Sequence, residues 1–447
     1  MLKAGFGRVT ITPPFGIPLA GYFVERPMDG VLDELEIQAL ALDDGENKTL
    51  ILAADLLGIR AVDLNPVRKA IAQRLNMAVE AVMIACTHTH TAPQISENTT
   101  GKLPEKWHFY QEMLWTKFVD AADLAVQDLA PAKMGYGVGN APHIAFIRRY
   151  RMKDGSVRTN PGVNNPDILA PIGTVDERVN VLRFVRDKGD IVLVNFGVHP
   201  DTIGGCKVSA DYPRFVRQTL ENTIEGSKVI FLNGAQGDVN HINISPTGGD
   251  YNGLAPQFDD CDRGYDHSRH MGRTIAGGVL QVYEKVQFVE DAKINFANSI
   301  CTIPANKGRE DQIPLAEKYA ALHKAGRDEE IPYKGMQLTT VVAEALRILR
   351  LRNGPEGFDL PLTAISVGPA VLVGIPGEPF TGIGRGIKEN SGFDITLPCC
   401  CANGYEGYYP MQDAYDEGGY EARSSNFAAG VAEKIIADSL KLVSELK

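Results

Sequence analysis

The sequence has no excess of positive charge and no long hydrophobic run, and each absence excludes a class of protein. Its 45 lysines and arginines are outnumbered by 56 aspartates and glutamates, which gives a net charge of −11 at pH 7. Because nucleic-acid binding requires a basic surface, we expect no nucleic-acid partner. No stretch approaches the ~20 apolar residues of a membrane helix, so we expect no integral membrane segment. The first residues, MLKAGFGRVTITPP, contain no apolar run typical of a signal peptide, which predicts a cytoplasmic protein unless a leader has been removed.

Cysteine is also scarce, with seven residues in 447 and no spacing typical of a disulfide framework. Cys399, Cys400 and Cys401 are consecutive, and adjacent cysteines rarely pair with one another, which favours a reducing compartment. The triplet has two interpretations. It can be a soft-metal or redox site, or it can be three small hydrophobic residues on a buried strand, and the second interpretation is favoured.

The sequence contains no internal repeat, low-complexity tract or Pro/Ser-rich linker, which favours one compact domain over residues 1–447. Apolar runs alternate with amphipathic segments, and this predicts an α/β fold with a mixed sheet flanked by helices. A charged, Ala- and Leu-rich segment at 309–353 is predicted to be a helical insertion, either a lid or an oligomer contact, so the oligomeric state stays open. The expected strands are 35–42, 49–58, 81–86, 132–137, 179–186, 191–198, 228–234, 287–303 and 362–377. The expected helices are 65–75, 106–128, 213–222, 266–285 and 427–446.

Two histidines follow the apolar run 81–86 in the segment THTHTAP (87–93). Side chains two positions apart in a strand point to the same side, so His88 and His90 are predicted to face one site. Two imidazoles there can be two metal ligands, or one ligand and a neighbouring hydrogen-bonding group. His199, in NFGVHPDT, comes directly after another apolar run and offers the third nitrogen ligand that a catalytic zinc site often has.

Further polar residues stand at the ends of later strands. The segment FLNGAQGDVNH (231–241) places Asp238, Asn240 and His241 after a strand, and it lacks the Lys-Ser/Thr pair of a phosphate-binding loop. Asp238 can equally stabilise the turn. Glu378, in VGIPGEPF, ends an apolar strand, where a carboxylate is costly unless it is metal-bound, paired or exposed. The wall of a pocket is indicated by a group of tyrosines, at positions 405, 408, 409, 415 and 420.

Taken in order, these segments resemble the neutral (alkaline, non-lysosomal) ceramidase family. The resemblance extends over nearly the whole chain, because it also covers AGFGRVTITPPFGIPLAGY, ADLLGI, SADYPRF and NGYEGYYP. It implies a catalytic zinc ion held by four residues: His88, His199, Glu378 and Tyr408. It also implies three residues that line the same site, namely His90 beside the substrate carbonyl, Tyr420, and Arg148 in FIRRYR, where the adjacent Arg149 leaves the register open.

The activity that the resemblance implies is hydrolysis of an amide or ester bond in a small-molecule substrate. Zinc can lower the pKa of bound water from 15.7 to about 7 and can polarise a carbonyl group. His90, Arg148 and Tyr420 are candidates to stabilise the oxyanion. Asn240, which we also count among the candidate catalytic residues, stands where the ceramidases carry a serine, which removes a serine acyl-enzyme route and leaves attack by zinc hydroxide. The ceramidases also carry a C-terminal β-sandwich domain for which this sequence leaves no room, so we expect a substrate other than ceramide.

Two other functions remain compatible with the sequence. Asn240 and the polar loop at 241–252 permit a metal-dependent lyase or isomerase that acts on a polar metabolite. A non-catalytic ligand-binding protein is the other, although all four implied metal ligands are present. A purely structural role is least favoured, because the polar residues cluster at strand ends.

Overall fold

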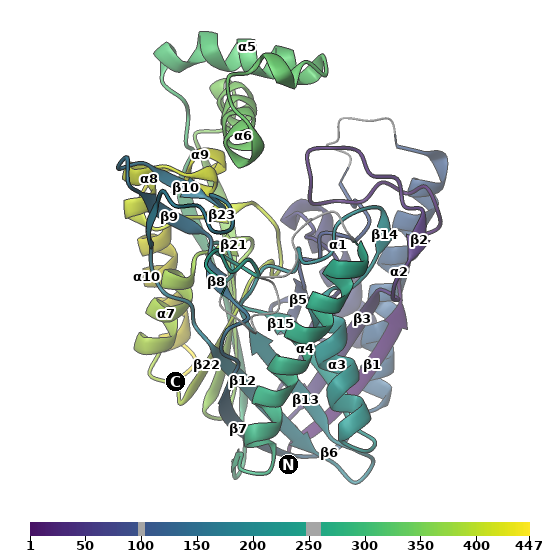
Figure 1. Ribbon diagram of the computed structural model, residues 1–447. Coiled ribbons are helices and arrows are strands. Elements are labelled where there is room, and N and C mark those ends of the chain that lie inside the picture. Colours follow the sequence, from purple (N-terminus) through teal and green to yellow (C-terminus); the bar gives the residue numbers. More distant parts are fainter. Residues whose placement is uncertain (97–102, 247–260) are drawn as a thin grey trace.

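Three larger β-sheets face one another in the computed structural model, which describes residues 1–96, 103–246 and 261–447 (Figure 1). The first sheet has the order β5 (Val82–Cys86), β4 (Lys48–Ala54), β3 (Glu36–Asp43), β1 (Lys3–Thr10) and β6 (Ala130–Pro131). The second has the order β15 (Lys228–Asn233), β13 (Ile191–Phe196), β12 (Arg178–Val185), β7 (Lys133–Asn140) and β17 (Gln287–Phe288). The third has the order β18 (Ile294–Pro304), β19 (Gly357–Val367), β20 (Ala370–Gly374) and β22 (Ile395–Cys399).

Shorter elements connect these sheets. The short strands are β2 (Gly30–Val31), β8 (Phe146–Ile147), β9 (Arg149–Met152), β10 (Val157–Thr159), β11 (Ile168–Pro171), β14 (Lys207–Val208), β16 (Val239–Asn240), β21 (Glu378–Pro379) and β23 (Tyr408–Tyr409). The short helices are α8 (Gln412–Glu417) and α9 (Tyr420–Ser424), with single 3₁₀ turns at Val79–Ala81, Glu310–Gln312 and Asp328–Glu330.

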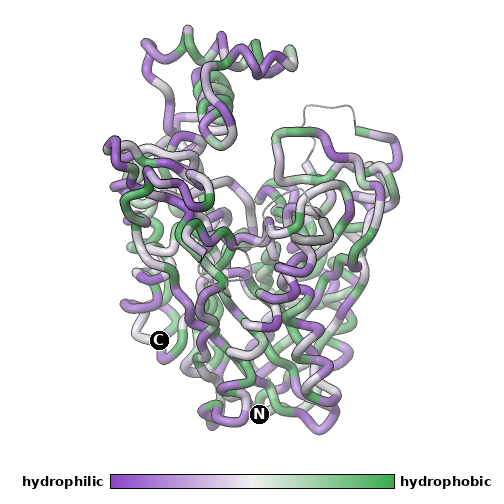
Figure 2. The backbone as a smooth tube through the Cα atoms, in the orientation of Figure 1, coloured by the Kyte–Doolittle hydropathy of each residue, from purple (hydrophilic) through white to green (hydrophobic). Residues whose placement is uncertain are grey.

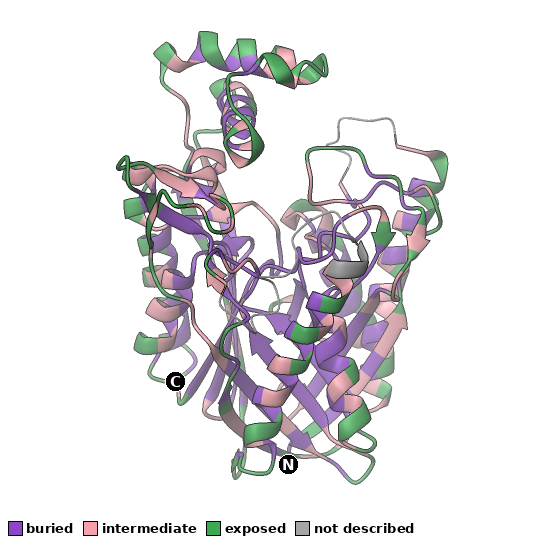
Figure 3. Cartoon of the chain, in the orientation of Figure 1, coloured by how far each residue is buried: buried purple, intermediate pink, exposed green. Residues whose placement is uncertain are grey.

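The central strands β4, β13 and β20 are buried on both faces, which explains why they are nearly continuous apolar runs rather than alternating ones. One face of each sheet contributes to a central core that the three sheets share, for example through Met83, Leu193 and Leu372. The other face packs against helices. The interior strands are hydrophobic and buried, whereas the outer helices are buried on one side and exposed on the other (Figures 2 and 3).

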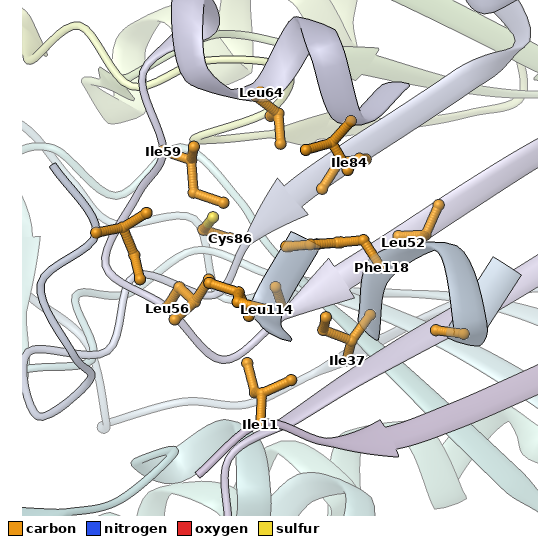
Figure 4. Close-up of a cluster of buried hydrophobic side chains, with 14 of the residues drawn as sticks. Ile11, Ile37, Leu52, Leu56, Ile59, Leu64, Ile84, Cys86, Leu114 and Phe118 are labelled. Carbon is orange, nitrogen blue, oxygen red and sulfur yellow. The ribbon is translucent and has the colours of Figure 1, made fainter. Parts of the chain in front are cut away.

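A pair of helices covers the outer face of each sheet. The first sheet is covered by α1 (Ala61–Leu75) and α2 (Glu105–Gln127), the second by α3 (Tyr212–Thr223) and α4 (Cys261–Tyr283), and the third by α7 (Thr381–Asn390) and α10 (Val431–Ser444). Figure 4 shows the core under α1 and α2, where Leu64 and Phe118 meet Leu52 and Ile84 of the first sheet. None of the described helices is long and apolar enough to cross a membrane.

The three sheets meet at the carboxyl ends of their parallel strands. Each sheet contains one parallel pair, β4 with β5, β13 with β15, and β20 with β22. Backbone hydrogen bonds join the ends directly, from Cys86 N to Cys401 O at 3.2 Å and from Cys400 N to Asn233 O at 3.0 Å. The Asn233 side chain adds a bond from Nδ2 to Thr87 O at 3.0 Å. In α/β proteins, ligands bind at the carboxyl ends of parallel strands. Here the carboxyl ends of three parallel pairs meet at a single candidate site.

A helical arm, residues 310–352, stands apart from the sheets at the top of Figure 1. It contains α5 (Ile313–Lys324) and α6 (Gly335–Arg352), which pack around a small apolar core of their own. The arm is attached to α9, because Arg347 Nε donates to Arg423 O at 2.8 Å and Arg423 Nε donates to Glu344 at 2.9 Å.

The predicted α/β class, with mixed sheets flanked by helices, is confirmed. The helical character predicted for 309–353 is seen in α5 and α6, whereas a lid role stays a prediction. Periodicity placed most of the longer strands to within a few residues, but it gave no range for β1 or β22 and covered β19 and β20 with one range. It did not show that the strands divide among three sheets, because strand order depends on contacts between residues far apart in the sequence.

A buried ion pair links the first two sheets near this junction. Arg217 on α3 donates to both carboxylate oxygens of Asp55, at 3.0 and 2.7 Å, and both side chains are fully buried. Asp55 follows β4, and its backbone N–H bonds to Glu36 O on β3 at 2.9 Å. The pair therefore fixes α3 against the end of the first sheet.

Replacing Arg217 by methionine should lower the free energy of unfolding by about 3–5 kcal/mol, because Asp55 would keep a buried charge without its cation. Urea titration followed by circular dichroism measures the change. Arg214→Met is the matched control, since Arg214 lies one turn earlier on α3, is 27% exposed and reaches only Glu36, at 4.0 Å. Equal losses in the two variants would contradict the assigned role of the Asp55 pair.

Candidate metal centre

The THTHTAP segment leaves the first sheet in a sharp turn. Strand β5 ends at Cys86, and His88 has a left-handed backbone with φ of 74°. His88 and His90 do face the same site, with ring centroids 5.1 Å apart, but the turn produces this arrangement and strand alternation does not. Both intervening threonines, Thr89 and Thr91, bond through their hydroxyls to Ser209 O, at 2.7 and 3.0 Å. The two threonines thus anchor the segment to Ser209, whereas the two histidine rings face the site.

His199 approaches His88 from the second sheet. It follows β13, and its backbone N–H bonds to Val239 O at 3.1 Å. Its ring Nε2 lies 3.2 Å from His88 Nε2, while its Nδ1 lies 3.4 Å from the carbonyl oxygen of Gln236. Burial and the nearby Arg148 guanidinium hold the pKa of His199 well below its ordinary value, so the ring is neutral at pH 7.

Glu378 comes to the same point from the third sheet. It lies on β21, which runs parallel to β23, and it is fully buried. Its Oε2 lies 3.3 Å from His88 Nε2 and 3.5 Å from His199 Nε2. The other oxygen, Oε1, accepts a hydrogen bond from the Tyr405 hydroxyl at 2.9 Å. Burial acts to raise the pKa of Glu378, but His88, His199 and Arg148 hold it below its ordinary value, so the group is a carboxylate.

These three atoms are electron donors that point at one another. His88 Nδ1 lies 2.7 Å from Leu57 O, and since a carbonyl only accepts, this nitrogen carries the proton. The same argument applies to His199 Nδ1 and Gln236 O. When both rings are neutral, their Nε2 atoms present lone pairs beside a carboxylate oxygen, an arrangement that a cation between them would stabilise. Ligands 2.0–2.1 Å from a tetrahedral zinc ion lie ~3.3 Å from each other, close to the distances observed among these donors.

His90 is the third member of a buried histidine group with His88 and His199, whose nearest ring nitrogens all lie within 4.8 Å of one another. Such a group can hold a metal ion. Neither ring nitrogen of His90 has a hydrogen-bond partner within the described part of the chain, although the ring is buried. Burial lowers the pKa of His90 to about 3, so its ring is neutral and available as a ligand or as a substrate contact.

Of the two adjacent arginines whose register the sequence left open, Arg148 lies beside Tyr408, and its assignment to the site stays a prediction. Its guanidinium lies 5.4 Å from the Tyr408 ring centroid. The same group donates hydrogen bonds to Glu421 Oε1 at 2.6 Å and to Gly237 O at 2.8 Å. Arg149 instead contacts Glu417 and the ring of Phe380. The buried Glu421 is also bound by the Thr159 hydroxyl at 2.9 Å, so the guanidinium is held in one position.

Two of the predicted tyrosines complete this wall. The Tyr408 ring stacks on His199, with centroids 6.4 Å apart and 17° between the planes. The Tyr420 ring packs against Tyr408 at 5.7 Å. Burial and the nearby Glu378 raise the pKa of Tyr408, so it is a neutral phenol in the metal-free site.

Asn240 and Asp238 have structural contacts. The amide of Asn240 donates to Asn160 Oδ1 at 2.9 Å, and its oxygen accepts from Ile242 N at 3.0 Å. Asp238 Oδ1 accepts from Thr381 N and Oγ1 at 2.7 and 2.8 Å, so this carboxylate holds the start of α7. Part of the polar loop predicted at 241–252, residues 247–252, lies outside the described residues.

The cysteine triplet is buried and free of disulfides. Burial raises the pKa of the Cys399 and Cys401 thiols, which favours inert protonated side chains. Cys401 Sγ lies 3.6 Å from His88 Nδ1, so it packs on the side of the ring that faces away from the donors.

Sequence reasoning placed Tyr405 only in a pocket wall and assigned no role to Gln236 or Asp201. In the structure Tyr405 bonds Glu378, Gln236 Nε2 lies 3.4 Å from Glu378 Oε2, and Asp201 lies beside His241. Tyr405 and Asp201 lie inside quoted motifs, and so were visible as polar residues within three positions of a predicted ligand. The roles of the Leu57 and Gln236 carbonyls as hydrogen-bond acceptors for the histidines could not be predicted, because every residue carries a main-chain carbonyl.

Comparisons with known proteins agree with this fold. No protein-family model and no curated protein matches the chain. Among solved structures, the chain is similar to neutral ceramidase from Pseudomonas aeruginosa, with a TM-score of 0.73 and 17% identity over 100% of this chain and 74% of that one. A ceramidase structure described as complexed with C2 gives a TM-score of 0.74 and 17% identity over 100% and 75%. The fold that the motifs indicated is therefore confirmed as a neutral-ceramidase-like fold.

Replacing Tyr405 by phenylalanine should weaken metal binding about 10- to 100-fold, because Glu378 loses the hydrogen bond that turns Oε2 toward the histidines. Competition with a chromogenic chelator measures the dissociation constant. Tyr415→Phe is the control, since its hydroxyl is bonded to Phe427 O at 2.7 Å and does not contact Glu378. Unchanged affinity in Tyr405→Phe would reject this role for the hydroxyl.

Proposed function

We propose that the chain is a zinc-dependent hydrolase that cleaves an amide or ester bond with metal-activated water, and that its substrate is not ceramide. The observation that supports this most is the meeting of His88 Nε2, His199 Nε2 and Glu378 Oε2 at 3.2, 3.3 and 3.5 Å with lone pairs facing one another. The likeness in fold to ceramidases adds support, since a ceramidase is a hydrolase.

We assign His88, His199, Glu378 and Tyr408 as the zinc ligands. Tyr408 is assigned as the fourth because its ring stacks on His199 and it lies within electrostatic reach of Glu378. A zinc ion held there supplies Lewis acidity toward a carbonyl group and lowers the pKa of water to about 7. Because these two nitrogen and two oxygen donors are already four ligands, the attacking water or the substrate carbonyl would occupy a fifth position, an expansion that catalytic zinc sites can undergo.

The remaining residues act on the substrate. His90 is held by its backbone, with N bonded to Pro200 O at 3.1 Å, and its unpartnered ring nitrogens can bond the substrate carbonyl. Arg148 provides a fixed positive charge for the oxyanion, because Glu421 and Gly237 O hold its guanidinium in place before the substrate arrives. Tyr420 can add a hydroxyl donor from the same wall. Asn240 supports the loop beneath them through Asn160 and takes no covalent part.

Replacing His199 by alanine should abolish turnover, with a loss of at least about 10³-fold, while a folded chain remains, because a ligand of the metal is removed. His108→Ala, at an exposed position on α2, should retain full activity. The measurement is product formation with amide and ester substrates, with circular dichroism to verify folding.

Hydrolysis in heavy-oxygen water separates the proposed reaction from a lyase or isomerase reaction. A hydrolase incorporates the label into the carboxylate product, since the attacking oxygen comes from water. Turnover without label in any product would reject the hydrolase assignment, and so would unchanged turnover in His199→Ala.

A further inference from the structure

A second polar pair, Asp201 with His241, lies beside the donors. Asp201 Oδ1 is 3.3 Å from His241 Nδ1, and the two side chains are only 10% and 9% exposed. Neither residue belongs to the proposed ligand set or to the oxyanion wall. Burying a carboxylate beside an imidazole carries a desolvation penalty in free energy. A pair of this kind next to a candidate site is therefore a candidate for a functional role.

The backbone places this pair on the side of the site where His90 lies. Asp201 is two residues after His199, and the carbonyl of the intervening Pro200 accepts the His90 N–H at 3.1 Å. His241 is joined to the same region through β16, because Val239 O accepts the His199 N–H at 3.1 Å. The pair is thus attached to both histidines through the main chain, and its position relative to them is fixed.

The groups around His90 are polar. The Tyr22 ring lies 5.5 Å from the His90 ring, and the Arg26 guanidinium lies 4.0 Å from the Tyr22 ring centroid. A Cβ added at Gly21 would lie 2.6 Å from His90 Nδ1, so the chain passes too close to the ring for any side chain there. On the far side, the His267 ring lies 5.4 Å from His241. A long acyl chain requires apolar pocket walls, and this flank presents imidazole, phenol, guanidinium and carboxylate groups instead.

On the basis of the proposed hydrolase function, we propose that Asp201, oriented by His241, binds a hydrogen-bond donor of the substrate, a hydroxyl or an ammonium group. The substrate is then a short polar amide or ester. An ionised carboxylate accepts hydrogen bonds and donates none, and within the described part of the chain Asp201 has no ion pair or hydrogen bond beyond its 3.3 Å approach to His241 Nδ1. A site built around such an acceptor discriminates against an otherwise identical molecule that lacks the donor, because the acceptor is then left buried and unpaired.

Three short hydroxamic acids test this without requiring turnover, since a hydroxamate can bind zinc directly. Butanohydroxamic, 3-hydroxypropanohydroxamic and 3-aminopropanohydroxamic acids have the same length and end in a methyl, a hydroxyl and an ammonium group. A second set is one methylene longer. Isothermal titration into the zinc-loaded chain should show about 10- to 100-fold tighter binding for a hydroxyl or ammonium member than for the methyl member in at least one set. The preferred end group identifies which donor is recognised.

Asp201→Leu should remove this preference while zinc content and the affinity for the methyl member stay unchanged. Asp201→Asn should lose the preference for ammonium more than that for hydroxyl, because its amide still accepts but carries no charge. Asp154→Asn, in an exposed turn, is the charge-matched control and should keep the full preference.

The outcomes separate this inference from the function on which it rests. Equal affinity across both sets in the wild-type chain, or a preference that survives in Asp201→Leu, would overturn the role of Asp201 and leave the zinc hydrolase standing. If no hydroxamate binds the zinc-loaded chain, both the proposed centre and the substrate class fail.

Discussion

The meeting of three electron donors, His88 Nε2, His199 Nε2 and Glu378 Oε2, is the constraint on which the rest of the structure depends. Each donor follows a strand of a different large sheet, β5, β13 or β20, and each is held by a partner on its far side: Leu57 O, Gln236 O and the Tyr405 hydroxyl. These partners turn the lone pairs inward. With both rings neutral, a cation between the donors would stabilise this arrangement, and the packing of the surrounding sheets holds the donors together.

The fold meets that requirement by joining the sheets at the point where the donors emerge. The main-chain bonds of Cys86 with Cys401 and of Cys400 with Asn233 connect strand ends from all three sheets, and the Asn233 amide adds Thr87, the residue before His88. The nearly continuous apolar strands β4, β13 and β20 are buried on both faces at the centre of the three sheets, and this packing restrains the junction. Catalytic centres gain from such rigidity, because charges that are already in position need no reorganisation during the reaction.

Much of this could be predicted from the sequence, and the remainder has identifiable physical causes. Apolar periodicity located the strands and helices, and polar residues directly after apolar runs located His88, His199 and Glu378. The division into three sheets, the left-handed turn at His88 and the role of Tyr405 could not be predicted. Each depends on contacts between distant segments, such as the 27 positions that separate Tyr405 from Glu378. Strand alternation was expected to bring the rings of His88 and His90 to one site, whereas in the structure a turn does so. The assignment of separate roles to the two histidines stays a prediction.

The central claim is that a metal ion lies between His88, His199 and Glu378. Anomalous X-ray diffraction from crystals of the zinc-loaded chain, collected on both sides of the zinc absorption edge, tests it most directly. The account predicts one strong peak about 2.0–2.2 Å from both Nε2 atoms and from a Glu378 oxygen. A peak bound by His88, His90 and His199 with Glu378 left outside, or no peak in a well-ordered site, would contradict it.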